Sequence, residues 1–87
     1  MKLWAVVAVF LCASLTVFGA DALIETQRKA EQGDAIAQTT LGFRYKLGIG
    51  VQKESAEAVR WWRKAANQGH AEAQTNLGVM YATGDGV

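Results

Sequence analysis

The 87-residue sequence contains no proline, one histidine and one cysteine, Cys12. Because Cys12 lies in the apolar first segment, the rest of the chain can form neither a disulfide nor a cysteine metal site. With only His70 as a histidine, no set of nucleophile, base and orienting group can be assembled, so we expect no catalysis, metal or cofactor. A surface or helix-capping role is expected for His70. The formal net charge of +1 gives no electrostatic reason to expect nucleic acid binding.

The first segment has the form of a secretory signal peptide. A single positive charge precedes an apolar run over residues 3–18, and small residues follow. Cleavage after Ala22 places Ala20 at the −3 position; cleavage after Ala20 places the bulky Phe18 there. The run is shorter than the ~20 residues that span a bilayer, so cleavage is favoured over an uncleaved anchor. A lipoprotein signal at Cys12 is disfavoured because small residues do not precede it.

We therefore expect residues 1–22 to be removed and the protein to lie in a bacterial periplasm or in the medium. Contact with a membrane is expected only through the signal segment before cleavage.

One stretch occurs twice, with an offset of 36 residues from Gly33 to Gly69. The pairs that match at this offset include Leu41 with Leu77 and Tyr45 with Tyr81. A fixed period of this size predicts a helical solenoid, in which each unit buries its face against its neighbours. Residues 23–87 are expected to form one domain, with a partial unit over 23–32, a full unit over 33–68 and a truncated unit over 69–87.

Helical spacing predicts helices over residues 23–32 and 35–47, from residue 54 or 55 to 68, and over 71–83. The helix over 54–68 has an apolar stripe made by Ala58, Trp61, Trp62, Ala65 and Ala66. Gly42 and Gly78 recur inside two helices, where glycine costs ~0.5–1 kcal/mol relative to alanine. We expect each to allow the close approach of another helix backbone. Arg60, Arg63 and Lys64 are expected to form a solvated basic face.

The motif Leu-Gly-x2-Tyr, at residues 41–45 and 77–81, resembles the first helix of a tetratricopeptide repeat. The wider pattern is more similar to the Sel-one-like repeat, with the tryptophan pair, the Arg63-Lys64 pair and an acidic residue, Glu54, at the capping position of the second helix. The resemblance implies an all-α fold, a short tetratricopeptide-like α-solenoid of antiparallel helix pairs preceded by a signal-peptide helix. It also implies a non-catalytic, exported adaptor or scaffold that binds a protein or peptide.

Two other functions remain open. Some disulfide-rich relatives of this family are linked to β-lactam hydrolysis, but they rely on regularly spaced cysteine pairs, which residues 23–87 lack. The chain could also be a truncated, non-functional fragment of a longer repeat protein, because it stops before a second helix of the last unit.

In tetratricopeptide-like solenoids, one side of each first helix lines a concave groove. In this sequence the corresponding residues are Ile36, Thr39, Phe43, Lys46, Leu47, Glu72, Thr75, Val79, Ala82 and Thr83. They mostly differ between the two copies, whereas the scaffold positions are the same, which favours a partner-binding groove. The alternative is that Phe43 and Val79 pack between adjacent units.

The helix over 71–83 has a second helix on one side only, so part of its face, around Leu77, Gly78 and Tyr81, is expected to be open. A partner helix could cover that face, the protein could pair with itself, or a truncated chain could fold poorly.

Overall fold

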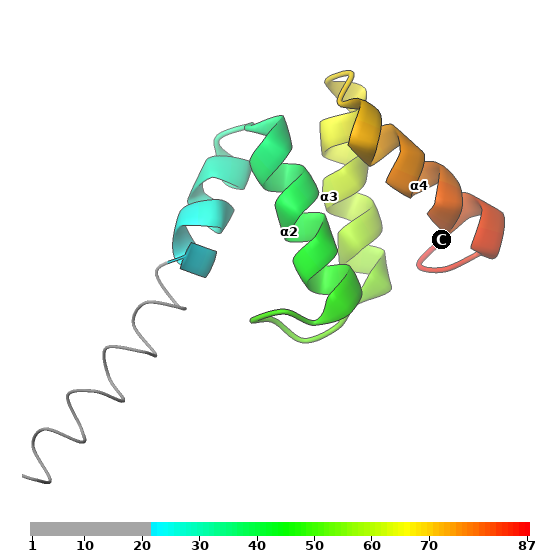
Figure 1. Cartoon of the computed structure of the whole chain (residues 1–87), viewed down its shortest axis with the longest axis horizontal. Helices are drawn as coiled ribbons and strands as arrows, with labels where there is room; N and C mark the ends of the chain where they lie inside the picture. The colour runs from blue at the N-terminus through cyan, green and yellow to red at the C-terminus, as the bar shows by residue number, and fades with distance from the viewer. Residues whose placement is uncertain (1–21) are drawn as a thin grey trace, which may run out of the picture.

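The part of the chain that this computed structural model describes, residues 22–87, forms four helices joined by short turns (Figure 1). The first covers residues 22–31; the others are α2 (Ala35–Leu47), α3 (Ser55–Asn67) and α4 (Ala71–Thr83). The predicted all-α solenoid is therefore confirmed, and the bounds of α2 and α4 are those expected. The predicted signal peptide lies outside the described residues apart from Ala22. Within them, no helix is long and apolar enough to cross a membrane.

Glycines end the helices as predicted. Gly48 and Gly84 follow α2 and α4 with φ of 72° and 70°, a left-handed conformation that costs glycine little. The helix starts differ more. The Asp34 carboxylate accepts a hydrogen bond from the Ala37 amide at 3.0 Å and so caps α2.

Glu54 occupies the capping position predicted for it, but its side chain does not cap the helix. Glu54 is the N-cap residue of α3, with extended backbone, but its side chain makes no capping hydrogen bond. Glutamate is longer than the preferred capping residues (Ser, Thr, Asp and Asn), whose short side chains accept hydrogen bonds from the first-turn amides. His70 likewise precedes α4 without a side-chain cap, so the capping role considered for it is not seen.

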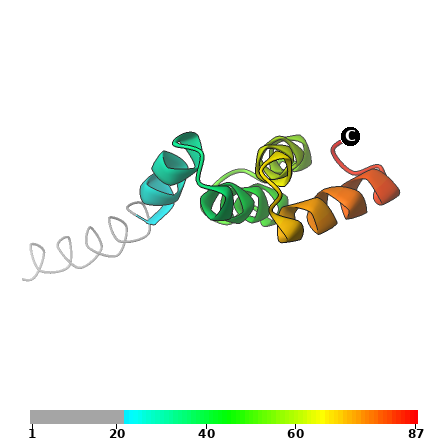
Figure 2. The same cartoon turned by 90° about the horizontal axis from the view of Figure 1, so that it is seen from above.

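Two adjoining apolar clusters fix the helix packing. Ala30 of the first helix joins Ala37, Leu41 and Trp61 in one cluster. The second cluster belongs to α3 and α4 and comprises Ala58, Val59, Trp62, Ala65, Ala73 and Met80. The tryptophans of the predicted α3 stripe therefore lie in different clusters. This places α2 between the first helix and α3, while α4 packs on α3, as Figures 1 and 2 show.

Gly42 does allow a close approach, but the neighbour is not the helix backbone that was predicted. A Cβ atom at Gly42 would overlap the indole ring of Trp62. The Trp62 ring, which comes from α3, therefore occupies the space that a side chain at position 42 would need. At Gly78, the equivalent position of α4, nothing lies within 4 Å of such an atom.

Candidate protein-interaction surface

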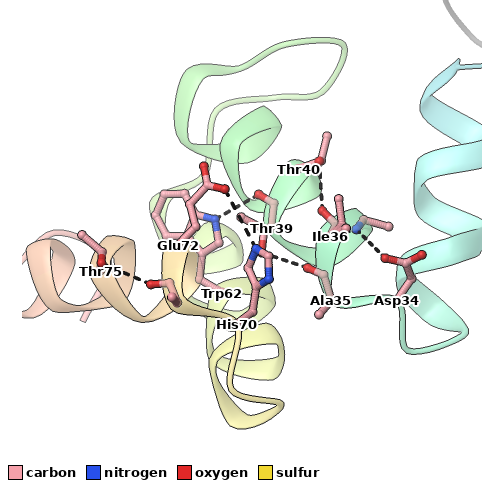
Figure 3. A network of polar contacts seen from close by, with 11 residues as sticks. Asp34, Ala35, Ile36, Thr39, Thr40, Trp62, His70, Glu72 and Thr75 are labelled. Carbon is pink, nitrogen blue, oxygen red and sulfur yellow. Dashed lines mark hydrogen bonds and ion pairs between the residues drawn. The ribbon is translucent and has the colours of Figure 1, made fainter.

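The residues predicted to line a groove are not all at the surface. Thr39 is 3% exposed. Its hydroxyl donates to the Ala35 carbonyl at 2.8 Å, and its own carbonyl accepts a hydrogen bond from Trp62 Nε1 at 3.0 Å (Figure 3). The Thr39 side chain is thus part of the α2–α3 interface and has little area to offer a ligand.

Phe43 is partly buried and packs against the apolar cluster of α3 and α4. Its ring meets the Trp62 ring edge to face, with centroids 5.2 Å apart and an interplanar angle of 75°. Such aromatic pairs contribute ~0.5–1.5 kcal/mol beyond the area they bury. The Phe43 ring thus contacts a residue of its own repeat unit, whereas the alternative to a groove role was packing between adjacent units.

Lys46 connects α2 to the turn after α4. Its ammonium group forms an ion pair with the Asp85 carboxylate, and both side chains are partly exposed. This hydrogen bond, followed by one from Ser55, lowers the pKa of Asp85. The turn also lies close to the start of α3, since a Cβ atom at Gly86 would stand 2.7 Å from the Ser55 backbone. The sequence analysis did not predict this contact.

The remaining groove residues are exposed. On α2, Ile36 and Leu47 are 69% and 62% exposed, and on α4, Val79 is 56% exposed. The other exposed members, all on α4, are Glu72, Thr75, Ala82 and Thr83. Two of these are hydroxyl residues whose side chains donate to their own helix, Thr75 to Ala71 and Thr83 to Val79. The Glu72 carboxylate lies 3.9 Å from Nε2 of His70. The His70 side chain is partly exposed, in agreement with the surface role expected for it.

A hydrogen bond between the buried carboxamide of Gln38 and the exposed carboxamide of Gln68 escaped the sequence analysis. Gln38 donates from Nε2 to the Ala30 carbonyl at 3.0 Å, and its Oε1 accepts from Gln68 Nε2 at 2.9 Å. The amide thus links the first helix, α2 and the end of α3. The available signal was the glutamine that recurs at position 74 in the second copy. Gln74 repeats the first of these bonds, donating to the Ala66 carbonyl at 3.2 Å.

The basic residues of α3 are exposed to solvent and also contact aromatic side chains. The guanidinium of Arg60 and the ammonium of Lys64 lie 4.7 Å and 4.8 Å from the centroid of the Trp61 ring. Arg63 donates to the Tyr81 hydroxyl of α4 at 2.7 Å. Arg60 is also paired with Glu57, which raises the pKa of its guanidinium. These cations remain exposed, but cation–π contacts and hydrogen bonds partly satisfy them.

Between the first helix and α2 lies a shallow, open cleft of about 340 Å³. Its walls mix apolar and charged side chains, from Glu25, Thr26, Lys29, Asp34, Ile36, Ala37 and Thr40. A carboxylate of this wall, Glu25, is neutralised by Arg28, whose hydrogen bond lowers the pKa of Glu25. Within residues 22–87, no three histidine, cysteine or acidic residues stand close enough to hold a metal ion. The cleft therefore offers contact area rather than convergent chemistry.

The comparison with known families agrees with the repeat geometry. A model of the Sel1 repeat matches residues 35–70 and again residues 71–87. The boundary between the two matches falls at the start of α4, where the structure also begins a second unit. No curated protein is significantly similar to the chain. Sel1 repeats are generally protein–protein interaction modules and are typically non-catalytic. The two matches cover more than half of the sequence, and the chain belongs to the Sel1 repeat family.

Proposed function

We propose that the protein is an exported, non-catalytic adaptor that binds a protein or peptide along the exposed sides of α2 and α4. The observation that carries the proposal is the exposure of Ile36, Leu47 and Val79 on helices whose opposite sides are fixed in the core. Exposed apolar side chains on a rigid frame can bind a partner at a small entropic cost, because they are already ordered.

The variable hydroxyl and acidic residues around these side chains would give selectivity. Thr83 and Glu72 occupy α4 positions whose counterparts on α2 are Leu47 and Ile36. The two helices therefore present different chemistry at matching positions, which suits an extended ligand that contacts both. The proposed binding surface does not include Thr39 and Phe43, because these two side chains pack against α3.

Affinity capture from an extract of the producing bacterium tests the proposal. The variant Leu47→Asp with Val79→Asp should lose the captured partner, since both charges fall on exposed positions that the fold tolerates. Ile24→Asp is the matched control, because Ile24 is 59% exposed but lies on the first helix and is not part of the proposed surface. A partner recovered in this way would then be titrated against the purified proteins by calorimetry. Equal capture by wild type and the double variant would refute the proposed surface.

Export is tested separately. The amino-terminal sequence of the protein recovered from the periplasm or the medium should begin at Asp21 or Leu23. Recovery of the uncleaved chain from the cytoplasm alone would contradict this part of the proposal.

A further inference from the structure

The outer face of α3 has an excess of positive charge. Arg60, Arg63 and Lys64 are spaced at i, i+3 and i+4, so they share one side of the helix, and all three are exposed. Glu57 is the only acidic residue of α3. The face thus has three positive charges against one negative charge, in a chain whose formal net charge is only +1. The positive charge is therefore concentrated on this helix.

The first helix, one repeat earlier, differs at the matching positions. Arg60 and Arg63 lie 36 residues after Ile24 and Gln27, which are uncharged. The first helix packs on α2 without a charge at either position. The packing of a repeat therefore does not require the two arginines of α3.

The partner of the third cation also differs between the two helices. On the first helix, Arg28 donates to Glu25, with Nε 3.1 Å from the carboxylate. The equivalent pair on α3 is Lys64 and Trp61, and the Lys64 ammonium lies 4.8 Å from the centroid of the Trp61 ring. An indole thus replaces the carboxylate, so the contact that holds Lys64 leaves its charge unneutralised.

Neutral groups hold two of the cations in place. Tyr81 accepts a hydrogen bond from Arg63 at 2.7 Å, and the Trp61 ring attracts Lys64. Among residues 22–87, neither of these two cations forms an ion pair. A guanidinium has five N–H donors and an ammonium has three, so both retain donors for an external acceptor. Because they are already positioned, binding an anion would cost little side-chain entropy.

The remaining cation shows which kind of anion suits the face. Arg60 donates from Nε and Nη2 to the Glu57 carboxylate, with N–O distances of 3.2 Å and 2.9 Å. A carboxylate therefore fits among the exposed side chains of α3. Nucleic acid and anionic membranes are attracted mainly by the charge of the whole chain, which is weak at +1. A short acidic peptide depends on the local face instead.

We propose that the outer face of α3 binds an acidic segment of another protein, whose aspartate or glutamate carboxylates pair with Arg63 and Lys64. This goes beyond the proposed function, because the surface proposed there lies on α2 and α4. The two proposals can fail separately, since a titration with a synthetic peptide needs no captured partner.

The probe is hexaglutamate labelled with fluorescein, titrated with the full-length chain at low ionic strength. Fluorescence anisotropy should show saturable binding that added salt weakens, and hexaglutamine with the same label should not bind. Arg63→Gln with Lys64→Gln should weaken binding by about fivefold or more, because both ion pairs are lost. Both positions are exposed, so circular dichroism should show an unchanged fold.

The matched control is Lys29→Gln with Lys53→Gln. This variant removes the same net charge from two exposed lysines outside α3 and should bind hexaglutamate nearly as wild type does. Equal weakening by the two double variants would show that only the net charge matters, and would overturn the proposal. Absence of saturable binding would overturn it as well.

Two other anions test the competing classes of partner. A labelled single-stranded DNA of matching charge and vesicles that contain phosphatidylglycerol should both bind less tightly than hexaglutamate. Tighter binding of either one would assign the face to nucleic acid or to a membrane surface, and would overturn the proposal.

Discussion

α2 and α4 have the same length and the same Leu-Gly-x2-Tyr core, yet they occupy different environments. Leu41 is 1% exposed between the first helix and α3, whereas Leu77 is only partly buried and Tyr81 is 54% exposed. Each helix contacts the preceding helix in the same way, as the bonds of Gln38 and Gln74 show. The difference arises on the other side, where α3 covers α2 and no described helix covers α4. Burial in a repeat protein is therefore a property of the neighbours as much as of the residue.

Substitution of Trp62, which covers α2 and has no counterpart over α4 among the described residues, should have the largest effect on the free energy of unfolding. Trp62→Ala takes a buried ring from the α2–α3 interface and leaves Phe43 and Thr39 without their partner. We expect a loss of about 3–5 kcal/mol in the free energy of unfolding, measured by urea denaturation with circular dichroism. A loss of that size approaches the whole stability of a small domain, so Trp62→Phe provides a graded variant with an intermediate loss.

The control for Trp62→Ala lies on the open helix. Val79→Ala removes an exposed side chain from α4 and should change the free energy of unfolding by no more than about 0.5 kcal/mol. The comparison between the helices would be wrong if the two substitutions had similar costs.

The two helix glycines should respond with opposite signs. Gly42→Ala places a methyl group against the Trp62 ring and should destabilise the fold by about 1–3 kcal/mol. Gly78→Ala meets nothing within 4 Å and should stabilise it by about 0.5–1 kcal/mol through helix propensity. Thermal unfolding of both variants beside wild type measures the two shifts. Destabilisation by Gly78→Ala would indicate that its face is covered.

The repeat explains which parts of the fold were predictable. Two copies in register specify the bounds of α2 and α4 and the glycines that end them, and helical spacing alone specifies the apolar stripe of α3, because these depend on spacing within a few turns. The neighbour of Gly42 was predicted wrongly because a recurring glycine shows only that space is needed. Whether a backbone or an indole uses that space depends on how α3 is rotated against α2.

The candidate surface was less predictable than the fold. A helical wheel places Thr39 and Phe43 on the same side of the helix as Ile36 and Leu47. It contains no information on how far the side chains of the neighbouring helix extend over that side. The Trp62 ring is large enough to extend around α2 and engage both residues. The contact between Lys46 and Asp85 joins residues 39 positions apart through a turn, so local periodicity could not indicate it.

Capping gives a smaller contrast between the helices. Asp34→Ala removes the side-chain acceptor at the start of α2 and should cost about 1 kcal/mol. His70→Ser introduces an acceptor at the start of α4, where none exists, and should gain a few tenths to about 1 kcal/mol. Chemical denaturation of the two single variants tests this. A loss with His70→Ser equal to that with Asp34→Ala would show that His70 contributes to stability by packing instead.

The smallest expected effect concerns the turns that follow the two helices, where Asp85 occupies the position of Ile49. The pKa of Asp85 is lowered in the folded protein by Lys46 and Ser55, so the ionised carboxylate stabilises the fold. This contribution is fully present above the pKa of an unfolded aspartate, about 3.9, and is lost as the pH falls through the lower pKa of the folded state. Asp85→Asn should therefore lower the melting temperature slightly at neutral pH, and the difference from wild type should shrink as the pH falls below about 4.

Lys46→Gln should give the same pH-dependent difference, and the double variant should be no less stable than either single one, because both remove the same ion pair. Additive losses would show that the two residues stabilise the fold independently, and added salt should reduce the effect of each single variant because both side chains are partly exposed.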